Sequence, residues 1–452
     1  MNAIAPIPHD DSHARLDRLE DTARRLLERC AAHGASQAEV NCSEDAGLSV
    51  NVRMGEVETV ESTRDRSVSV TVYFGKRKGV ASTADLREDS LEATVAQACA
   101  IARHTEEDAA SGLADAARMA TDAHELDTWH PWDVDAGRAI ALALAAEAAG
   151  REVDGRIANS DGASTSTNAS LGVYANSHGF VGRERGTHHS IGCALIAGQG
   201  DAMQRDGWYS LALDAADLQD ARAIGRRAGE RALARLQPRP LATGKYPVLF
   251  AAEAARSLVG HFLGAVSGGA LYRKASFLLD SAGTRLFPEW FALHERPLRP
   301  RGLRSAWFDG EGVATADSAL VEGGVLQRYV LGSYSARRLG LQSTANAGGI
   351  HNLDVAANAG DFQAMLGMLG RGLLVTELMG QGVNPVTGDY SRGAAGFWVE
   401  DGAIAYPVDG ITIAGNLKAM YAGVQAVGSD VDERSHIRSG SMLLAPMTVA
   451  GG

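Results

Sequence analysis

The sequence has no apolar run long enough to cross a membrane, since the best candidate, residues 140–146, ends at Glu147. The N-terminal segment also has no apolar core of the kind that a secretory signal needs. It is acidic at Asp10, Asp11, Asp17 and Glu20. We therefore expect neither a membrane span nor a signal peptide.

Cysteine is scarce, and no C-x-x-C pair occurs among the four residues Cys30, Cys42, Cys99 and Cys193. Widely spaced cysteines of this kind are typical of reduced, buried thiols, so we expect a cytoplasmic location. Basic residues are outnumbered by acidic ones, which gives a net charge of −12. That charge disfavours nonspecific binding to nucleic acid or to anionic membranes.

Two common catalytic motifs are also missing. The chain contains no G-x-S-x-G turn for a serine nucleophile and no G-x-x-x-x-G-K-[ST] loop for nucleotide phosphates. What is present is a chain of 452 residues with 45% hydrophobic content, which is enough for two or three domains with packed cores.

The order of predicted elements indicates an α+β fold in two parts. We expect an N-terminal α+β domain over residues 1–237, with a linker or surface excursion near residues 106–135, which are acidic and poorly periodic. The segment Pro238–Gly244 holds two prolines and a glycine and is the predicted boundary. Residues 238–452 are expected to form a β-rich, largely antiparallel α+β domain.

Hydrophobic periodicity predicts the N-terminal elements. Helices are expected over residues 13–33, 90–104, 135–151 and 215–236. Short strands are expected over residues 48–52, 57–60 and 68–72 and around Val80, with hairpin turns at residues 54–56, 159–162 and 176–179.

The C-terminal part is predicted to open with a strand over residues 246–250 and a helix over 251–266. Further strands are expected over residues 303–309, 313–318 and 325–331, with a hairpin turn at 322–324, and Asp361 is expected to cap a helix that ends at Leu369. Short apolar runs predict strands over 373–375, 396–400 and 403–406, the last one stopped by Pro407. The polar loop before residue 396 is where binding groups are expected.

Long motifs in this region resemble one family. GDYSRGAAGFWVE (388–400, followed by the turn Asp401-Gly402) and YPVDGITIAGNLKAMY (406–421) are similar to the C-terminal signature of the TldD/PmbA proteins. The segments 272–283 and 333–353 carry the same resemblance. The resemblance implies a heterodimeric metallopeptidase built from one metal-bearing and one metal-free subunit, and this chain looks like the metal-free type.

The metal-bearing members carry a His-Glu-x-x-x-His helix whose histidines hold zinc and whose glutamate activates water. On the matching helix, His261 takes the first histidine place, but Phe262 and Val266 take the places of the glutamate and the second histidine. The family's cysteine ligand near the C-terminus has no counterpart within residues 435–446. We therefore expect no metal and no catalytic residue in this chain, and zinc in a TldD-like partner subunit.

Several residues of the family-like segments are candidates for contact with the partner or with a peptide: His351, Asn352, Asn384, Asp389, Tyr390, Arg392 and Trp398. Arg392 has an alternative role in an internal ion pair with Asp389. Arg337 and Arg338 belong either to a solvated helix face or to the subunit interface, and the sequence does not choose between the two. Trp398 and Tyr406 are also typical core anchors.

The resemblance implies a subunit that helps to degrade or process flexible peptides, including peptide-antibiotic precursors and unfolded small proteins. Two alternatives stay open. The chain could be a stand-alone hydrolase with a site that the motifs do not reveal. It could equally be a peptide-binding homodimer without catalytic activity.

Overall fold

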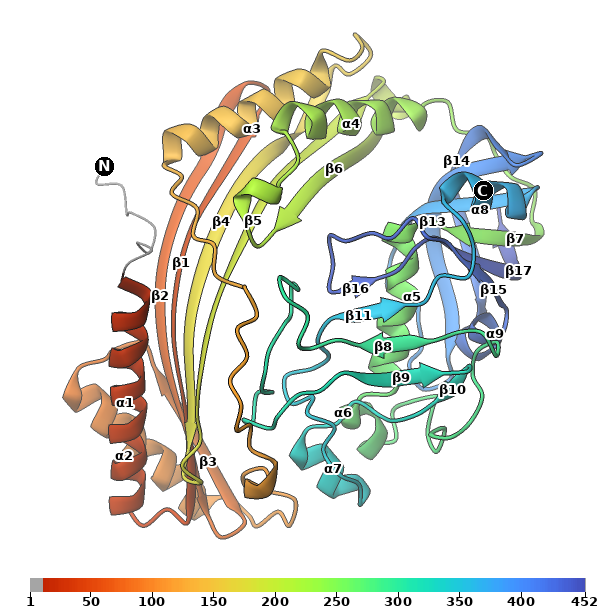
Figure 1. Ribbon diagram of the computed structural model, residues 1–452. Coiled ribbons are helices and arrows are strands. Elements are labelled where there is room, and N and C mark those ends of the chain that lie inside the picture. The colour runs from red at the N-terminus through yellow and green to blue at the C-terminus, as the bar shows by residue number, and fades with distance from the viewer. Residues whose placement is uncertain (1–10, 452) are drawn as a thin grey trace.

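The computed structural model describes residues 11–451 and confirms the predicted α+β class (Figure 1). The prediction about the signal peptide concerns mainly the first ten residues, which lie outside the described part. Within residues 11–451, no helix combines the length and the apolar character that a membrane crossing requires. The predicted boundary at residues 237 and 238 stays a prediction.

A large curved sheet dominates the first half of the chain (Figure 1). Its strands run antiparallel in the order β3-β2-β1-β4-β5-β6. The bounds are β1 Gln37–Arg53, β2 Glu56–Phe74, β3 Arg77–Thr83, β4 Asn159–Asn176, β5 Val181–Ala197 and β6 Gln204–Ala212.

Four helices cover one face of this sheet, and they confirm the predicted helices: α1 Ser12–Ala32, α2 Glu88–His104, α3 Ala136–Arg151 and α4 Ala221–Ala234. Alternate strand residues such as Val40 and Cys42 are buried beneath α1 and α2, while Val50 and Ile191 pack with α3 and α4. The intervening residues are small and polar and face the second half of the chain, because side chains alternate along a strand.

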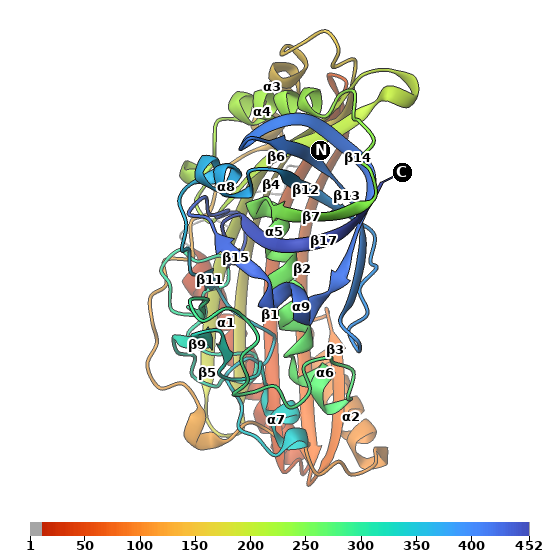
Figure 2. The same cartoon turned by 90° about the vertical axis from the view of Figure 1, so that its right-hand side faces the viewer.

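The second half folds around a closed sheet in the order β14-β13-β12-β7-β17-β15, in which β14 also pairs with β17. The bounds are β7 Gly244–Phe250, β12 Gly372–Met379, β13 Asp389–Glu400, β14 Ala403–Asn416, β15 Val424–Val427 and β17 Met442–Ala450. Helix α5 (Ala252–Ala265) shares one apolar cluster with the side chains that these strands bury. Figure 2 shows these strands in front of the long strands of the large sheet.

A smaller sheet of order β10-β9-β8-β11-β16 lies between the large sheet and the closed one (Figure 1). Its strands are β8 Leu293–Glu295, β9 Ser318–Glu322, β10 Val325–Leu326, β11 Leu353–Val355 and β16 Ile437–Arg438. Four short helices complete the fold: α6 Gly268–Tyr272, α7 Ser333–Leu339, α8 Phe362–Leu369 and α9 Leu417–Ala422. The Asp361 carboxylate caps α8 as predicted, because it accepts the Ala364 N–H.

Several boundaries in the first half differ from the predictions. The two short strands expected over residues 57–60 and 68–72 form the single strand β2, whose residues 56–67 are exposed and therefore show no apolar pattern. The turn expected at residues 159–162 is instead a bulge within β4, where Gly162 adopts a φ of +109°. Helix α4 begins at Ala221 rather than at 215, because Asp220 caps it there.

The strands expected over residues 303–309 and 313–318 are wrong, since only an isolated bridge joins Phe308 to Ala314. The buried Asp309 carboxylate accepts the backbone N–H groups of Glu311, Val313 and Ala347, and these bonds replace a strand ladder. The strand expected over 325–331 shortens to β10.

Pro407 does not stop its strand, because β14 continues to Asn416. The Pro407 carbonyl accepts the Arg239 N–H at 2.9 Å, on the side away from β13. The missing N–H of the proline therefore faces the same side and costs no bond with β13.

The contact between α3 and α4 gives a test of this packing. A Cβ at Gly225 would lie 1.8 Å from the Ala146 carbonyl oxygen, so we expect Gly225→Ala to destabilise the chain by about 1–3 kcal/mol through overpacking. Gly264 of α5 is the matched control, because a Cβ there meets no atom within 4 Å. Thermal unfolding followed by circular dichroism should show a lower midpoint for Gly225→Ala only; equal midpoints would contradict the packing.

Candidate functional site

Phe262 of α5 and Val266 just after it, the positions at which the resemblance implies metal-site residues in other members, lie in an apolar core. Phe262 is fully buried, and its ring packs edge-on against Phe287 at 5.2 Å and Tyr421 at 5.7 Å between centroids. Val266 is also fully buried and lies just past the last turn of the helix. These two positions supply hydrocarbon and no lone pair, so they cannot ligate a cation.

His261 lies on the neighbouring face of α5, close to Tyr390 and Arg392 of β13. Its ring is 6.0 Å from that of Tyr390, and its Nε2 atom is buried without a hydrogen-bond partner. Burial lowers the pKa of His261, and the positive charge of Arg392 lowers it further. The same positive charge disfavours a metal cation at this position.

The predicted polar loop is in part a strand, because β13 already begins at Asp389. The side chains of Tyr390 and Arg392 share one face of it and Asp389 takes the other, so the ion pair proposed between Asp389 and Arg392 does not form. Asp389 instead accepts hydrogen bonds from Thr387 at 2.6 Å and Asn416 at 3.2 Å, which lower its pKa.

Asn384 and Asp389 are exposed at the turn before β13, and Arg392 is half-buried. Tyr390 is 1% exposed and Trp398 is 3% exposed, so both side chains belong to the core. Burial raises the pKa of Tyr390 to about 12. Among these candidates, only Asn384, Asp389 and Arg392 offer a surface to a partner or a peptide in this structure.

Trp398 and Tyr406 serve packing on the closed sheet. The Trp398 ring meets Tyr246 edge-on at 5.1 Å, and its indole N–H donates to Glu400 at 3.0 Å. The Arg239 guanidinium lies 4.8 Å from the centre of the Tyr406 ring. Both aromatic residues are therefore anchors within the chain.

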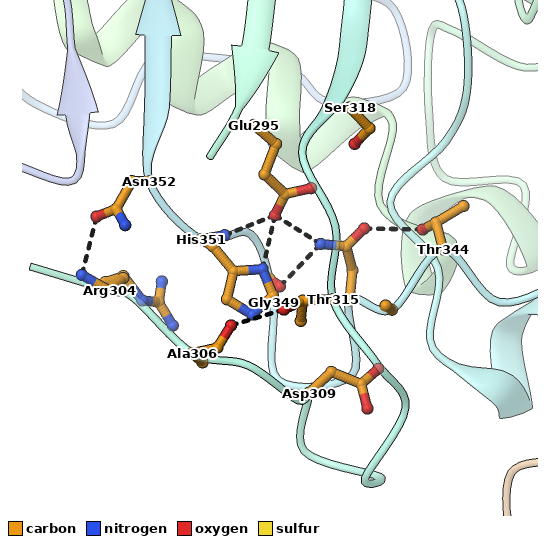
Figure 3. Close-up of polar contacts among 12 residues, drawn as sticks. Glu295, Arg304, Ala306, Asp309, Thr315, Ser318, Thr344, Gly349, His351 and Asn352 are labelled. Atoms are coloured by element: carbon orange, nitrogen blue, oxygen red, sulfur yellow. Dashed lines mark hydrogen bonds and ion pairs between the residues drawn. The ribbon is translucent and has the colours of Figure 1, made fainter. Parts of the chain in front are cut away.

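His351 belongs to a buried polar network around Glu295 (Figure 3). One Glu295 oxygen accepts the backbone N–H of His351, the His351 Nδ1–H and the Asn346 amide, each at 2.8 Å. The other oxygen accepts from Arg328. Burial acts to raise the pKa of Glu295, but the His351 bond and the Arg328 charge outweigh it and lower the pKa.

Asn352 ties a neighbouring loop to the same region (Figure 3). Its side-chain oxygen accepts the Arg304 N–H at 2.9 Å, and its amide donates to the Arg296 carbonyl at 3.1 Å. His351 and Asn352 are 8% and 2% exposed, so both act as internal supports in this structure.

Arg337 is exposed in the last turn of α7, in line with a solvated helix face, and its role at a subunit interface stays a prediction. Its guanidinium donates to the carbonyls of Ala110 at 3.0 Å and Gly112 at 2.8 Å, so it fastens α7 to the segment 106–135 within the same chain. Arg338 is half-exposed and lies 3.8 Å from Asp108 of that segment. The segment itself contains no α-helix or long strand, as predicted for a linker.

A cavity of about 400 Å³ lies between the large sheet and the segment 302–307. Its wall includes Ser43, Ser170, Glu184 and His188, which belong to the sheet face that no helix covers. Loss of bulk solvent raises the pKa of Glu184 and lowers that of His188. The sequence motifs did not predict this polar wall. The pattern that could have revealed it is the alternation of small polar residues along β1 and β4.

No group of three or more His, Cys, Asp or Glu side chains that could hold a metal ion occurs within residues 11–451. All four cysteines are buried and unpaired. Burial raises the pKa of Cys30, Cys42 and Cys193 to about 12, so these thiols stay protonated at neutral pH.

Three models of the PmbA/TldA metallopeptidase family match the chain: domain 1 over residues 38–102, the central domain over 129–236 and the C-terminal domain over 243–451. Metalloprotease PmbA of Escherichia coli O157:H7 is 46% identical over 433 residues, which cover 96% of each chain. A PmbA homolog of Haemophilus influenzae is 44% identical over 448 residues, which cover 98% of this chain and 99% of the relative.

Solved structures share the whole architecture. A Bacteroides thetaiotaomicron protein, described as a proposed modulator of DNA gyrase, superposes with a TM-score of 0.91 at 25% identity and covers 96% of this chain and 99% of its own. TldE from Thermococcus kodakarensis superposes with a TM-score of 0.83 at 20% identity and covers 95% and 99%. At that identity the second likeness shows the fold alone.

The network around Glu295 gives a stability test. Glu295→Gln leaves the partly buried Arg328 guanidinium without its counter-charge, so we expect a loss of about 3 kcal/mol near neutral pH. Because the folded pKa of Glu295 is lowered, its contribution is present above the unfolded pKa and is lost as pH falls through the folded value. The difference between the variant and the parent should therefore shrink in acid.

Glu322→Gln is the matched control, because Glu322 also meets a histidine, His294 at 2.7 Å, but at an exposed position. Urea unfolding at several pH values measures both variants. A Glu295→Gln effect as small as that of Glu322→Gln, or one that does not depend on pH, would contradict the stabilising role of the network.

Proposed function

The chain belongs to the PmbA/TldA metallopeptidase family, and from that premise we propose that it is the metal-free subunit of a TldD/TldE-type heterodimer. The observation that carries the proposal is the burial of Phe262 and Val266 in an apolar core. The two hydrocarbon side chains occupy the positions where the metal-bearing type of subunit has its glutamate and its second histidine.

The other side chains near α5 do not replace the glutamate and the second histidine as metal-site groups. One imidazole cannot hold zinc against water, because protein sites normally supply three or four ligands. His261 has the positively charged Arg392 beside it, and the buried thiols keep their protons. We therefore assign the zinc, and with it the hydrolytic chemistry, to a TldD-like partner.

In this proposal the chain helps to enclose and orient an extended peptide. The uncovered face of the large sheet carries small polar side chains such as Ser43, Ser166, Asn168 and Ser170, with Gly172 beside them. Hydroxyl and amide groups can bond the backbone of a peptide whatever its side chains are. Such a wall suits flexible or unfolded substrates, including precursors of peptide antibiotics.

The free, buried cysteines also support a cytoplasmic location, where thiols stay reduced. A stand-alone hydrolase and a peptide-binding homodimer without activity remain as alternatives, and no particular contact in the structure favours either one. The co-expression experiment described next distinguishes both alternatives from the proposal.

Co-expression with a relative that carries His-Glu-x-x-x-His tests the proposal. We expect a stable pair that degrades an unfolded peptide, and we expect His261→Ala in this chain to leave that activity little changed. The matched control is the same change at the first histidine of the partner's motif, which should abolish hydrolysis. Circular dichroism of the His261→Ala chain checks that it still folds.

The other outcomes discriminate clearly. Hydrolysis by this chain alone would favour the stand-alone hydrolase. Peptide binding by this chain alone, with no hydrolysis when the relative is added, would favour the binding homodimer. A loss of activity of the pair on His261→Ala, with folding intact, would contradict the assignment of catalysis to the partner.

A further inference from the structure

A second cavity, of about 380 Å³, lies where the two halves of the chain meet. Strand β6 and helix α4 form one wall, and α5, β12 and β13 form the other. Three carboxylates and six arginines line it, which is unusual in a chain whose net charge is −12. The arginines are Arg205, Arg231, Arg235, Arg256, Arg392 and Arg434.

Five of these arginines are neutralised by carboxylates of the same chain. The pairs are Arg205–Asp161 at 2.6 Å, Arg231–Asp206 at 3.0 Å, Arg231–Glu253 at 2.6 Å, Arg235–Glu377, Arg256–Asp432 at 3.3 Å and Arg434–Asp432 at 2.8 Å. Six guanidinium groups thus face five carboxylates, and the cavity keeps an excess of one positive charge.

Arg392 carries this excess. The described residues offer it no ion-pair partner, and its Nε atom is fully buried without a hydrogen-bond acceptor. The guanidinium is half-buried at the start of β13, between the cavity and the face of α5 that carries His261. Because Nε is buried, a ligand in the cavity can reach this guanidinium only through its two terminal nitrogens, which have no carboxylate partner among the described residues.

The walls of the cavity are held in place. The Trp208 ring lies between two guanidinium groups, that of Arg227 at 3.5 Å and that of Arg434 at 3.6 Å from its centre. Its indole N–H donates to Gln219 at 3.1 Å. These contacts fix the aromatic wall, so a ligand would enter a largely formed site, which lowers the entropy cost of binding.

We propose that this cavity binds one carboxylate of a peptide on Arg392. A guanidinium matches a carboxylate with two parallel hydrogen bonds. A single excess positive charge suits a monoanion, whereas the carboxylates of the wall repel a phosphate dianion. The carboxylate comes either from the peptide's C-terminus or from an aspartate or glutamate side chain.

The inference rests on the proposed function only in taking the ligand to be a peptide. Arg256 and Ser257 of α5 line the cavity, and His261 follows Ser257 by four residues on the same helix face. A bound carboxylate would thus anchor a peptide beside the face where the metal-bearing type of subunit begins its ligand set. The site would select acidic or C-terminal segments.

Calorimetric titration of the isolated full chain tests the site. One arm compares acetyl-trialanine with a free C-terminal carboxylate against the same peptide as an amide. The other compares acetyl-Ala-Glu-Ala-amide with its glutamine analogue. We expect binding only for peptides that carry a carboxylate, and the arm that binds identifies its source. Added salt should weaken the binding.

Arg392→Gln should weaken carboxylate binding by about tenfold to a hundredfold, as expected for the loss of charge-assisted hydrogen bonds. Arg392→Lys keeps the positive charge but not the planar pair of N–H groups that can bond both carboxylate oxygens. We therefore expect it to weaken carboxylate binding to an intermediate degree. Arg226→Gln removes a positive charge from an exposed position of α4 and should bind as the parent does. Thermal melts check that each variant is folded.

Equal binding of carboxylate and amide peptides would overturn the proposal, and so would no binding of any peptide. Unchanged binding by folded Arg392→Gln, or saturable binding of inorganic phosphate alone, would do the same. These results leave the proposed function untouched, because the activity of the co-expressed pair is measured separately. Failure of that pair to form or to hydrolyse peptide would, in turn, leave carboxylate binding by the isolated chain unaffected.

Discussion

The packing of Phe262 is the constraint on which the rest of the structure depends. Its ring fills the space between α5 and the inner residues Phe287 and Tyr421, so the apolar core of the closed sheet is continuous there. A glutamate at this position would bury a charge without a partner, at high energetic cost. In the proposed function, the side chain that completes this core stands where the metal-bearing subunit has the glutamate that activates water.

The sequence predicted the elements that have strong periodicity or clear end signals. Helices α1, α2 and α3, the cap at Asp361 and the strand β7 follow from such signals. The length of β2 did not, because its residues 56–67 are paired but exposed and carry no apolar pattern. The closure of β14 onto β17 joins residues far apart in sequence, which local patterns cannot reveal.

The same limit applies to the site. The hydrocarbon character of Phe262 and Val266 was readable from the sequence, because residue type alone decides it. The polar network that buries His351 was not readable, because Glu295 and Arg328 reach it through tertiary contacts. The arginine-lined cavity was missed for a similar reason: its residues come from both halves of the chain, and only Arg392 stood out in sequence.

In the proposed function, the chain thus combines a polar, uncovered sheet face with a helix that holds hydrocarbon where the partner has metal ligands. This combination suits a subunit that shapes a peptide chamber and leaves hydrolysis to its partner. The most direct test is an anomalous difference map, recorded at the zinc absorption edge, from crystals of the co-expressed pair. The account predicts one strong peak at the partner's His-Glu-x-x-x-His helix and none near His261; a zinc peak beside His261 would contradict it.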